Sequence, residues 1–149
     1  MKAKKYLIVL LAAVALTAVS CEETPIYGDL DGMWQLMEEQ TGESTVNRKD
    51  DRMYISFRRH LAQFDGHGQP RLYVGSYTYE RDSIFFTTIS YRSAQTVEAH
   101  DNVPLTDADI SLMNDWGIYE VDPAFRVVSL SSSHLVLRSA YSELHFRKF

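Results

Sequence analysis

Residues 125–149, FRVVSLSSSHLVLRSAYSELHFRKF, carry the clearest structural signal in the sequence. Apolar and polar residues alternate in three runs, 125–130, 134–139 and 142–149, which is typical of β-strands with one buried face. Ser131-Ser132-Ser133 and Ala140-Tyr141 separate the runs, and both connections are short enough to join antiparallel neighbours. The stretch therefore predicts a three-stranded antiparallel meander.

The side chains of the last two runs also predict their register. Pairing about Ala140-Tyr141 brings apolar residues together on one face: Leu137 with Leu144, and Leu135 with Phe146. The same register places Arg138 opposite Glu143 on the other face. Apolar pairs on one face and an opposite-charge pair on the other both stabilise this register.

A second hairpin is predicted from residues 72–80 and 83–91, joined by Arg81-Asp82. Its register gives three cross-strand pairs: Tyr77 with Phe86, Val74 with Ile89, and Leu72 with Tyr91. Both faces hold large side chains, with Tyr73, Tyr77 and Tyr79 on one and Leu72, Val74, Phe85 and Ile89 on the other. Such a hairpin suits a barrel wall with an occupied lumen, and equally a central strand pair covered by a helix.

The alternation in residues 53–64 changes phase part-way along. The apolar face is carried first by Met53, Ile55 and Phe57, then on the opposite parity by His60, Ala62 and Phe64. A change of parity within a strand is typical of a β-bulge, which we place at Arg58-Arg59. Without a bulge, Arg59 would point into the interior, where a guanidinium needs an acid, a hydroxyl or a ligand carboxylate as partner.

One helix is predicted before the final meander. Thr106 stands at the N-cap position, and acidic residues follow it near the positive end of the helix dipole. Ile110 and Met113 repeat at helical spacing, and Gly117 can end the helix. We expect residues 106–116 to cover an opening or one end of the sheet, with Ile110 and Met113 inward.

The charge balance is acidic. The chain has 15 Lys and Arg against 20 Asp and Glu, and three of the lysines lie in the first 20 residues, so the remaining 129 residues carry a formal charge of −8. A net acidic domain is unsuited to a phosphate backbone, so we expect no nucleic-acid partner. Seven acids and no base lie from Glu98 to Asp122, which fits a solvated surface or contact with a basic protein.

The first 20 residues have the parts of an export signal. A cationic head, residues 1–5, precedes an apolar run of 14 residues, 6–19, which is shorter than the roughly 20 that span a bilayer. Ala18-Val19-Ser20-Cys21 resembles the lipobox of bacterial lipoproteins, although that family usually has leucine where Ala18 stands. The resemblance implies cleavage before Cys21 and a lipid on its thiol. An ordinary cleaved signal and an N-terminal membrane helix are the alternatives.

Residues 21–30 are expected to form a tether, and residues 31–149 one domain. Gly32-Met33-Trp34 at the head of the first strand resembles the lipocalin-like domains of uncharacterised Gram-negative envelope lipoproteins. In that family the tryptophan, here Trp34, plugs the closed end of the barrel, and the glycine, here Gly32, allows close approach. The resemblance implies an all-β, lipocalin-like antiparallel barrel of about eight strands, with the helix inserted before the last three. A two-sheet β-sandwich is the alternative, because strand patterns do not distinguish closure from stacking.

The sequence holds none of the motifs that carry common catalytic chemistry. It lacks a Gly-rich phosphate loop, a G-x-S-x-G elbow, an HExxH motif and paired cysteines, since Cys21 is the only cysteine. His60, Asp65 and His67 could reach one metal ion across a turn, but three ligands without a fixed scaffold are weak evidence. We therefore expect no metal, no cofactor and no enzymatic activity.

Two functions fit these features. The first is an outer-membrane lipoprotein, on the periplasmic or surface face, whose barrel binds a small, partly apolar ligand through Arg59, Tyr73, Tyr77 and Tyr79. The second is an envelope interaction module, an assembly partner or an inhibitor of a basic enzyme, that uses its acidic surface and takes no small ligand. A lumen lined by apolar and aromatic groups would favour the first, and a filled barrel the second.

Overall fold

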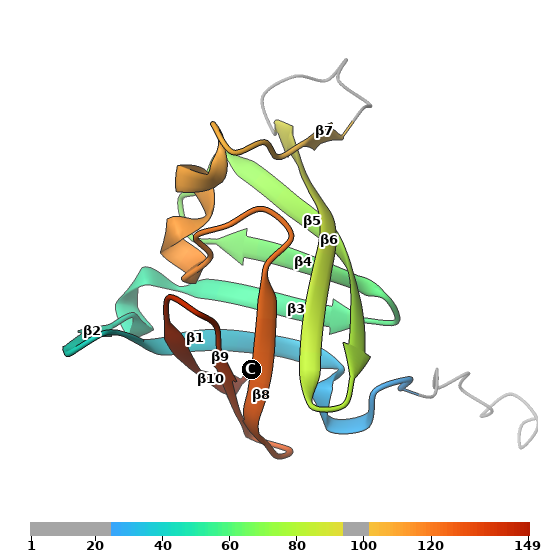
Figure 1. Ribbon diagram of the computed structural model, residues 1–149, viewed down its shortest axis with the longest axis vertical. Coiled ribbons are helices and arrows are strands. Elements are labelled where there is room, and N and C mark those ends of the chain that lie inside the picture. Colours follow the sequence, from blue (N-terminus) through green and yellow to red (C-terminus); the bar gives the residue numbers. More distant parts are fainter. Residues whose placement is uncertain (1–24, 94–101) are drawn as a thin grey trace, which may run out of the picture.

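The computed structural model describes residues 25–93 and 102–149. Eight antiparallel strands form a barrel in the order β1 (Gly32–Thr41), β3 (Met53–Arg58), β4 (Leu61–Gly66), β5 (Arg71–Glu80), β6 (Ser83–Ser93), β8 (Ala124–Leu130), β9 (His134–Arg138) and β10 (Glu143–Lys148). Pairing of β10 with β1 closes the ring, as Figure 1 shows. The closed ring confirms the predicted eight-stranded barrel and excludes the sandwich.

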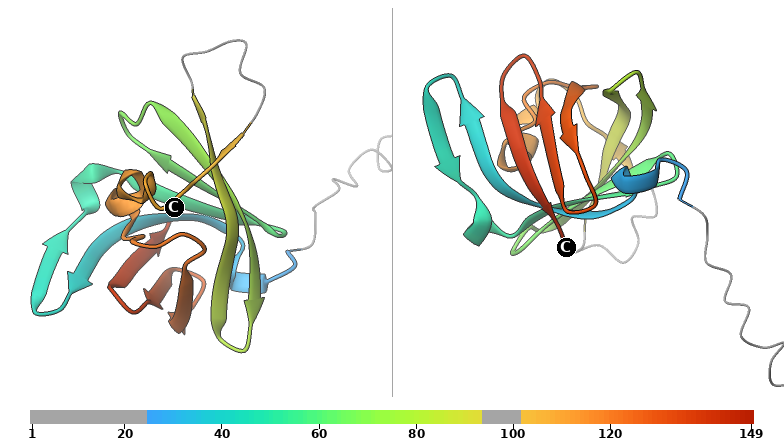
Figure 2. Two further views of the ribbon diagram at one scale, coloured as in Figure 1. Left: turned by 45° about the horizontal axis from the view of Figure 1, so that its top comes forward. Right: turned by 90° about the horizontal axis from the view of Figure 1, so that it is seen from below.

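Short elements extend this barrel. Strand β2 (Ser44–Asn47) pairs with β1, and β7 (Val103–Pro104) pairs with β6. The described residues include three 3-10 helices: η2 (Gly28–Leu30), η3 (Lys49–Asp51) and η4 (Ile110–Trp116). Helices η2 and η4 lie at opposite ends of the barrel (Figures 1 and 2). Among the described residues, every helix is too short or too polar to cross a membrane.

The C-terminal meander has the predicted register. Leu137 pairs with Leu144, and Leu135 pairs with Phe146, and all four are buried. On the outer face Arg138 pairs with Glu143, and Arg138 Nε donates a hydrogen bond of 2.6 Å to the carboxylate. The buried pairs and this ion pair fix one register, because a slip by one residue would reverse both faces.

The predicted bulge at Arg58-Arg59 is wrong. The chain reverses there: Arg58 pairs with Leu61, and Arg59 and His60 form the turn, in which Arg59 has a φ of 57°. Paired residues of antiparallel strands share a face, so the pairing of Phe57 with Ala62 produces the same change of parity as a bulge. Residues 53–64 therefore form a hairpin, and Arg59 lies at its exposed tip.

The hairpin of β5 and β6 follows the prediction only near its turn. Arg81 and Asp82 have φ angles of 49° and 63°, as a two-residue type I′ turn requires, and Tyr77 pairs with Phe86. Farther from the turn the register shifts by one, and the pairs are Val74 with Ser90, Tyr73 with Tyr91, and Leu72 with Arg92. The predicted pairs of Val74 with Ile89 and Leu72 with Tyr91 are therefore wrong.

The shift comes from an extra residue in β6. Thr88 has a φ of 54°, and its amide donates a hydrogen bond of 2.9 Å to Asp122 Oδ1 instead of to β5. Ile89 then turns inward, onto the tyrosine face rather than the opposite one, and is 2 % exposed. Gly75 makes this possible, because a Cβ there would lie 2.9 Å from Ile89 Cγ1.

Helix η4 covers one end of the barrel, as predicted, but begins later. Thr106 is not its N-cap: the Thr106 hydroxyl instead donates a hydrogen bond of 2.7 Å to the carboxylate of Asp109, which itself precedes the helix. Met113 is buried and Ile110 half-buried against the core. Gly117 ends the helix at a φ of 70°.

Side chains fill the interior of the barrel. Phe57, Phe64, Tyr77 and Phe86 pack ring to ring, with centroids 5.1–6.2 Å apart. The two tryptophans, Trp34 and Trp116, are fully buried. Aromatic rings thus occupy the space in which a ligand-holding lumen was expected.

Candidate functional site

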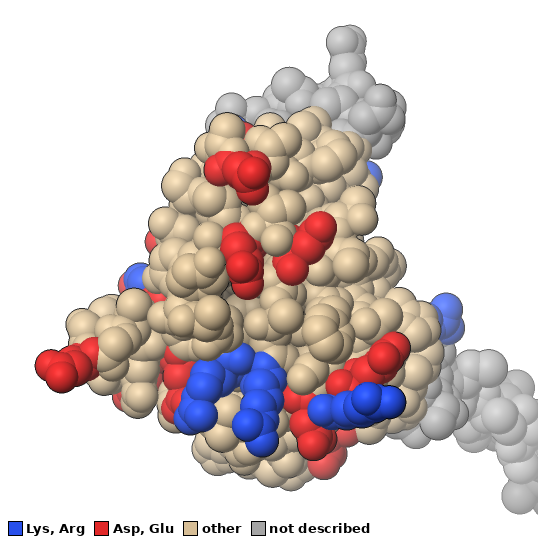
Figure 3. All heavy atoms as spheres, in the orientation of Figure 1, with Lys and Arg blue, Asp and Glu red and all other residues tan. Residues whose placement is uncertain are grey.

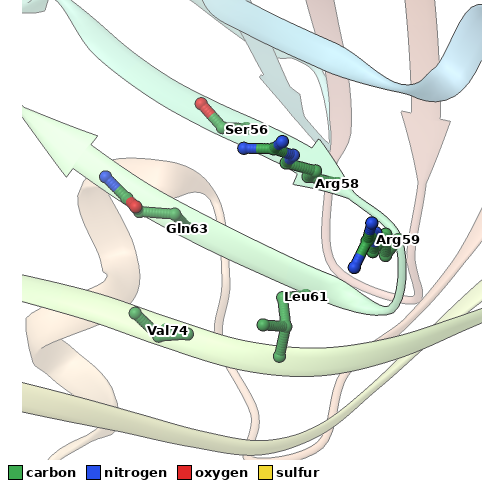
Figure 4. Close-up of a pocket in the computed structure, with 6 residues that line it drawn as sticks. All are labelled: Ser56, Arg58, Arg59, Leu61, Gln63 and Val74. Carbon is green, nitrogen blue, oxygen red and sulfur yellow. The ribbon is translucent and has the colours of Figure 1, made fainter. Parts of the chain in front are cut away.

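A hollow of about 490 Å³ lies on the outer face of the barrel wall. Strands β3, β4 and β5 and the β3–β4 turn supply its lining, as Figure 4 shows. Its residues are Ser56, Arg58, Arg59, Leu61, Gln63 and Val74. All six point away from the interior because their neighbours of opposite parity, such as Phe57, Ala62 and Tyr73, are buried in the core.

Cross-strand pairing brings these side chains together. Ser56 pairs with Gln63, and Gln63 pairs with Val74, which gives one row across three strands. Arg58 and Leu61 form the adjacent pair, and the turn places Arg59 beside them. Leu61 is 55 % exposed, and both arginines are exposed. The hollow is thus lined by two guanidinium groups, two apolar side chains, one hydroxyl and one amide.

The predicted ligand residues do not form one site. Arg59 lines the hollow, but it lies outside the barrel instead of among the apolar groups inside. Tyr73 and Tyr77 are buried, and Tyr79 packs against the core from its edge. Tyr73 contacts Trp116 at the η4 end, whereas Tyr77 and Tyr79 contact Tyr27 at the η2 end. The prediction that these tyrosines bind ligand with Arg59 is not supported, because they are core residues.

Burial changes the titration of these tyrosines. It raises the pKa of Tyr73, Tyr77 and Tyr79, because the charged phenolate is disfavoured away from water. At Tyr77 the negative charge of Asp31 adds to this effect. The Tyr77 hydroxyl and Asp31 Oδ1 are both buried, and neither has a hydrogen-bond partner of standard geometry. These tyrosines therefore stay neutral and serve packing.

Trp34, to which the resemblance assigned the plug of the closed end, is fully buried beside η2. Its indole Nε1 donates a hydrogen bond of 2.8 Å to the carbonyl of Leu30, and Lys148 Nζ lies 4.8 Å from the centroid of its ring. Gly32 has a φ of 126°, and a Cβ there would lie 2.8 Å from Lys148 Cε. The glycine therefore permits the close approach of Lys148 to Trp34.

The segment before Gly32 packs on the barrel and does not stand off it. Leu30 is fully buried, so the domain begins before residue 31, where the sequence placed its boundary. Asp31 Oδ2 accepts hydrogen bonds of 2.7 Å and 3.3 Å from the amides of Ile26 and Tyr27. Only the part of the expected tether before residue 25 lies outside the described residues, together with Cys21.

A buried polar cluster was missed in the sequence. Glu39 on β1 is 2 % exposed, and its carboxylate accepts hydrogen bonds from Arg48 Nη2 at 2.6 Å and from the Tyr119 hydroxyl at 2.5 Å. Burial, followed by Glu39, raises the pKa of Tyr119 to about 12. Alternation from Trp34 and Leu36 would place Glu38 on the inward face, but a register shift between Leu36 and Glu38 turns Glu39 inward instead. The local sequence pattern therefore gave no signal for this cluster.

The candidate metal ligands are also separated. His60 lies in the β3–β4 turn, whereas Asp65 and His67 lie at the far end of β4 and beyond it. Within residues 25–93 and 102–149, no three histidine, cysteine or carboxylate side chains gather as a metal site requires.

Acidic and basic side chains are unevenly placed. Figure 3 shows acidic groups without basic ones over the region of η4 and the segment that follows it, and basic groups mixed with acidic ones toward the opposite end of that face. Asp107, Asp109, Asp115, Glu120 and Asp122 belong to this acidic region. Glu98 and Asp101 lie outside the described residues.

Comparison with known proteins gives the family. Residues 14–149 match the model of the lipocalin-like domain. The chain belongs to this family. A lipocalin-like protein from Bacteroides uniformis has a similar structure, with a TM-score of 0.60 and 22% identity over 82% of this chain and 100% of that one. No curated protein gave a significant match.

Two further solved structures resemble this lipocalin-like chain. An uncharacterized protein from Bacteroides eggerthii has a TM-score of 0.57 and 25% identity, over 80% of this chain and 99% of that one. A protein from Burkholderia xenovorans has a TM-score of 0.52 and 14% identity, over 89% and 93%. These likenesses support the barrel fold.

Proposed function

We propose that this lipocalin-like protein binds a small anionic amphiphile in the outer hollow, and that a lipid on Cys21 anchors it to the outer membrane. The observation that supports ligand binding is the placement of Arg58 and Arg59 beside the exposed Leu61 in one hollow. Its volume falls within the ~300–1,000 Å³ of small-molecule sites. Because side chains fill the interior, we place the ligand site on this outer face and not in the predicted lumen.

The lining suits a carboxylate with a short apolar tail. A guanidinium pairs with a carboxylate through two parallel hydrogen bonds. Leu61 and Val74 offer apolar contact to the tail, while Ser56 and Gln63 can bond a second polar group. No group in the hollow is arranged as a nucleophile with its base, so we propose a binding module and not an enzyme.

Binding is tested with octanoate, titrated against the protein and followed by NMR. Arg58→Gln and Arg59→Asn should each weaken binding several-fold, because a hydrogen bond to a charged group contributes about 1.5–3 kcal/mol, less at an exposed site. Asparagine at residue 59 tolerates the positive φ. Arg92→Gln, an exposed arginine on β6, is the matched control, and octanol tests the need for charge. Equal affinity in all variants would remove the hollow as the site.

The anchor is tested separately. Cys21→Ser should abolish labelling of the protein with a fatty-acid analogue and leave an uncleaved or soluble species. Labelling that persists in this variant would contradict the lipid anchor.

The filled interior also favours the second function, an envelope interaction module with no small ligand. Its acidic region around η4 would contact a basic protein. Chemical cross-linking in cells, compared between the protein and Asp107→Asn/Asp109→Asn, tests this alternative. The interaction function predicts that the unchanged protein cross-links to a partner, that the variant does not, and that neither binds octanoate.

A further inference from the structure

We infer that the β3–β4 hairpin faces the membrane and that Arg58 and Arg59 contact its anionic lipid headgroups. The inference rests on the proposed lipid at Cys21, and it names the bilayer as the source of the anionic amphiphile.

The N-terminal segment is fixed to this hairpin. The Tyr27 hydroxyl lies 3.0 Å from His60 Nδ1 in the β3–β4 turn, and the two rings meet edge to face at 5.6 Å. The Tyr27 ring also packs on Tyr77 and Tyr79, with centroids 5.5 Å and 5.8 Å away. Two backbone amides of this segment are held by Asp31. The chain therefore leaves the barrel beside His60.

The reach from there to the lipid is short. Ile26 is the fifth residue after Cys21, and an extended chain covers at most about 3.6 Å per residue, so the tether reaches about 18 Å in all. The six residues of β4 rise about 20 Å from the hairpin tip toward η4. The η4 end is thus about one tether length away from the hairpin tip, and we infer that the hairpin end, beside which the tether leaves the barrel, lies nearer to the membrane.

The hairpin has the chemistry of a lipid contact. From Met53 to Phe64 the chain has Arg58, Arg59 and His60 and no acid, although the protein as a whole is acidic. Leu61 is 55 % exposed. Juxtamembrane arginines are attracted to the negative surface of anionic lipids, and exposed apolar groups insert at the headgroup boundary.

Acids at the same end limit where the contact can form. Asp29 and Asp82 are exposed there, Asp82 next to Arg81 in the β5–β6 turn. The carboxylate of Asp31 is turned toward the amides of Ile26 and Tyr27. The turn end of the β3–β4 hairpin, residues 58–61, contains no acid and is therefore the part of this end that we place against anionic headgroups, whereas Asp65 lies near the other end of β4.

Depth-dependent fluorescence quenching tests the orientation on the lipidated protein in vesicles. Ser76→Cys, an exposed position that pairs with Leu61, and Ser111→Cys on η4 give two matched labelling sites at opposite ends. With a spin label on the lipid headgroup, the label at residue 76 should be quenched strongly and the label at residue 111 weakly. Equal quenching at both, or stronger quenching at residue 111, would overturn the orientation.

The headgroup contact is tested by lipid composition. Adding phosphatidylglycerol to phosphatidylcholine vesicles should increase quenching at residue 76, and Arg58→Gln/Arg59→Asn should remove the increase while Arg92→Gln keeps it. If quenching at residue 76 does not change when phosphatidylglycerol is added, the headgroup contact is overturned. If mass spectrometry finds no lipid on Cys21, both the anchor and the orientation are overturned. Octanoate binding tests the hollow independently of both.

Discussion

The Tyr119 hydroxyl donates a hydrogen bond of 2.5 Å to the buried carboxylate of Glu39, which joins the segment after η4 to strand β1. The other carboxylate oxygen accepts from Arg48, whose guanidinium also bonds Asp51 at 3.2 Å. Strand β1, the segment that follows β2 and the distant segment after η4 thus meet at one charge. Burying that charge is unfavourable, and these partners offset the cost.

Replacement of this carboxylate should destabilise the protein. Glu39→Gln keeps the shape but leaves Arg48 with Asp51 alone, and we expect a loss of about 3 kcal/mol, the low end for breaking a buried pair. Urea unfolding measures the loss. Glu38→Gln, the neighbouring and less buried acid, should change the free energy of unfolding by less than about 0.5 kcal/mol. Equal stabilities of the two variants would contradict a role for the cluster.

The protein should lose stability between pH 10 and 12. Burial and Glu39 raise the pKa of Tyr119 from its ordinary value near 10 to about 12. Above pH 10 the unfolded chain releases this proton while the folded chain keeps it, so the free energy of unfolding falls as pH rises. Tyr73, Tyr77 and Tyr79 contribute in the same direction.

Tyr119→Phe isolates one part of this slope. The variant should have a shallower fall in stability above pH 10 than the unchanged protein, and a tyrosinate absorbance titration should lose one high-pKa group. An unchanged slope would show that Tyr119 is exposed in solution. Tyr141→Phe, the half-exposed neighbour that Tyr119 contacts, is the control.

Alternation in the sequence predicted antiparallel strands, whereas the closed barrel was implied by the family resemblance that Gly32 and Trp34 carry. The register of β9 and β10 was predictable because Leu137, Leu144, Arg138 and Glu143 all favour one alignment. The bulge at Thr88 was not predictable, because it depends on a hydrogen bond from the Thr88 amide to Asp122, which lies 34 residues away. Local alternation contains no information about such a distant hydrogen bond.

The candidate site shows the same limit. Parity alone did not distinguish a bulge at Arg58-Arg59 from a reversal, since both place Phe57 and Ala62 on one face. Only the pairing of β4 with both β3 and β5 shows that Arg59 sits at a tip beside Leu61 and Val74. The hollow is formed by neighbours across three strands, and single-strand patterns do not reveal it.

Trp34 should dominate the stability of the η2 end. Trp34→Ala removes a fully buried ring and a hydrogen bond to Leu30, and we expect a loss of about 3–5 kcal/mol. Thermal unfolding measures it. Lys148→Met removes the cation over the ring and its hydrogen bond of 2.7 Å to the Asp29 carbonyl, and should cost about 1–2 kcal/mol. Phe149→Ala removes an aromatic ring that is 72 % exposed and is the control. Equal melting temperatures of Trp34→Ala and Phe149→Ala would contradict the role of Trp34 as a plug.

Gly117 and Gly42 separate backbone strain from crowding. Both have a positive φ, 70° and 61°, so alanine at either position is strained by about 1–2 kcal/mol. At Gly42 nothing lies within 4 Å of an added Cβ, whereas at Gly117 the Cβ would collide with Leu144 in the core. Gly117 also packs closely because its carbonyl accepts a hydrogen bond of 3.1 Å from Ser142.

Gly42→Ala should therefore show the strain alone, and Gly117→Ala should cost about 1–3 kcal/mol more from overpacking. Urea unfolding of both variants gives the difference directly. Shrinking the neighbour in Gly117→Ala/Leu144→Val should recover part of the extra loss, since the pair is in contact and its effects are not additive. Equal losses at the two glycines, or no recovery in the double variant, would show that the end of η4 is not packed on β10.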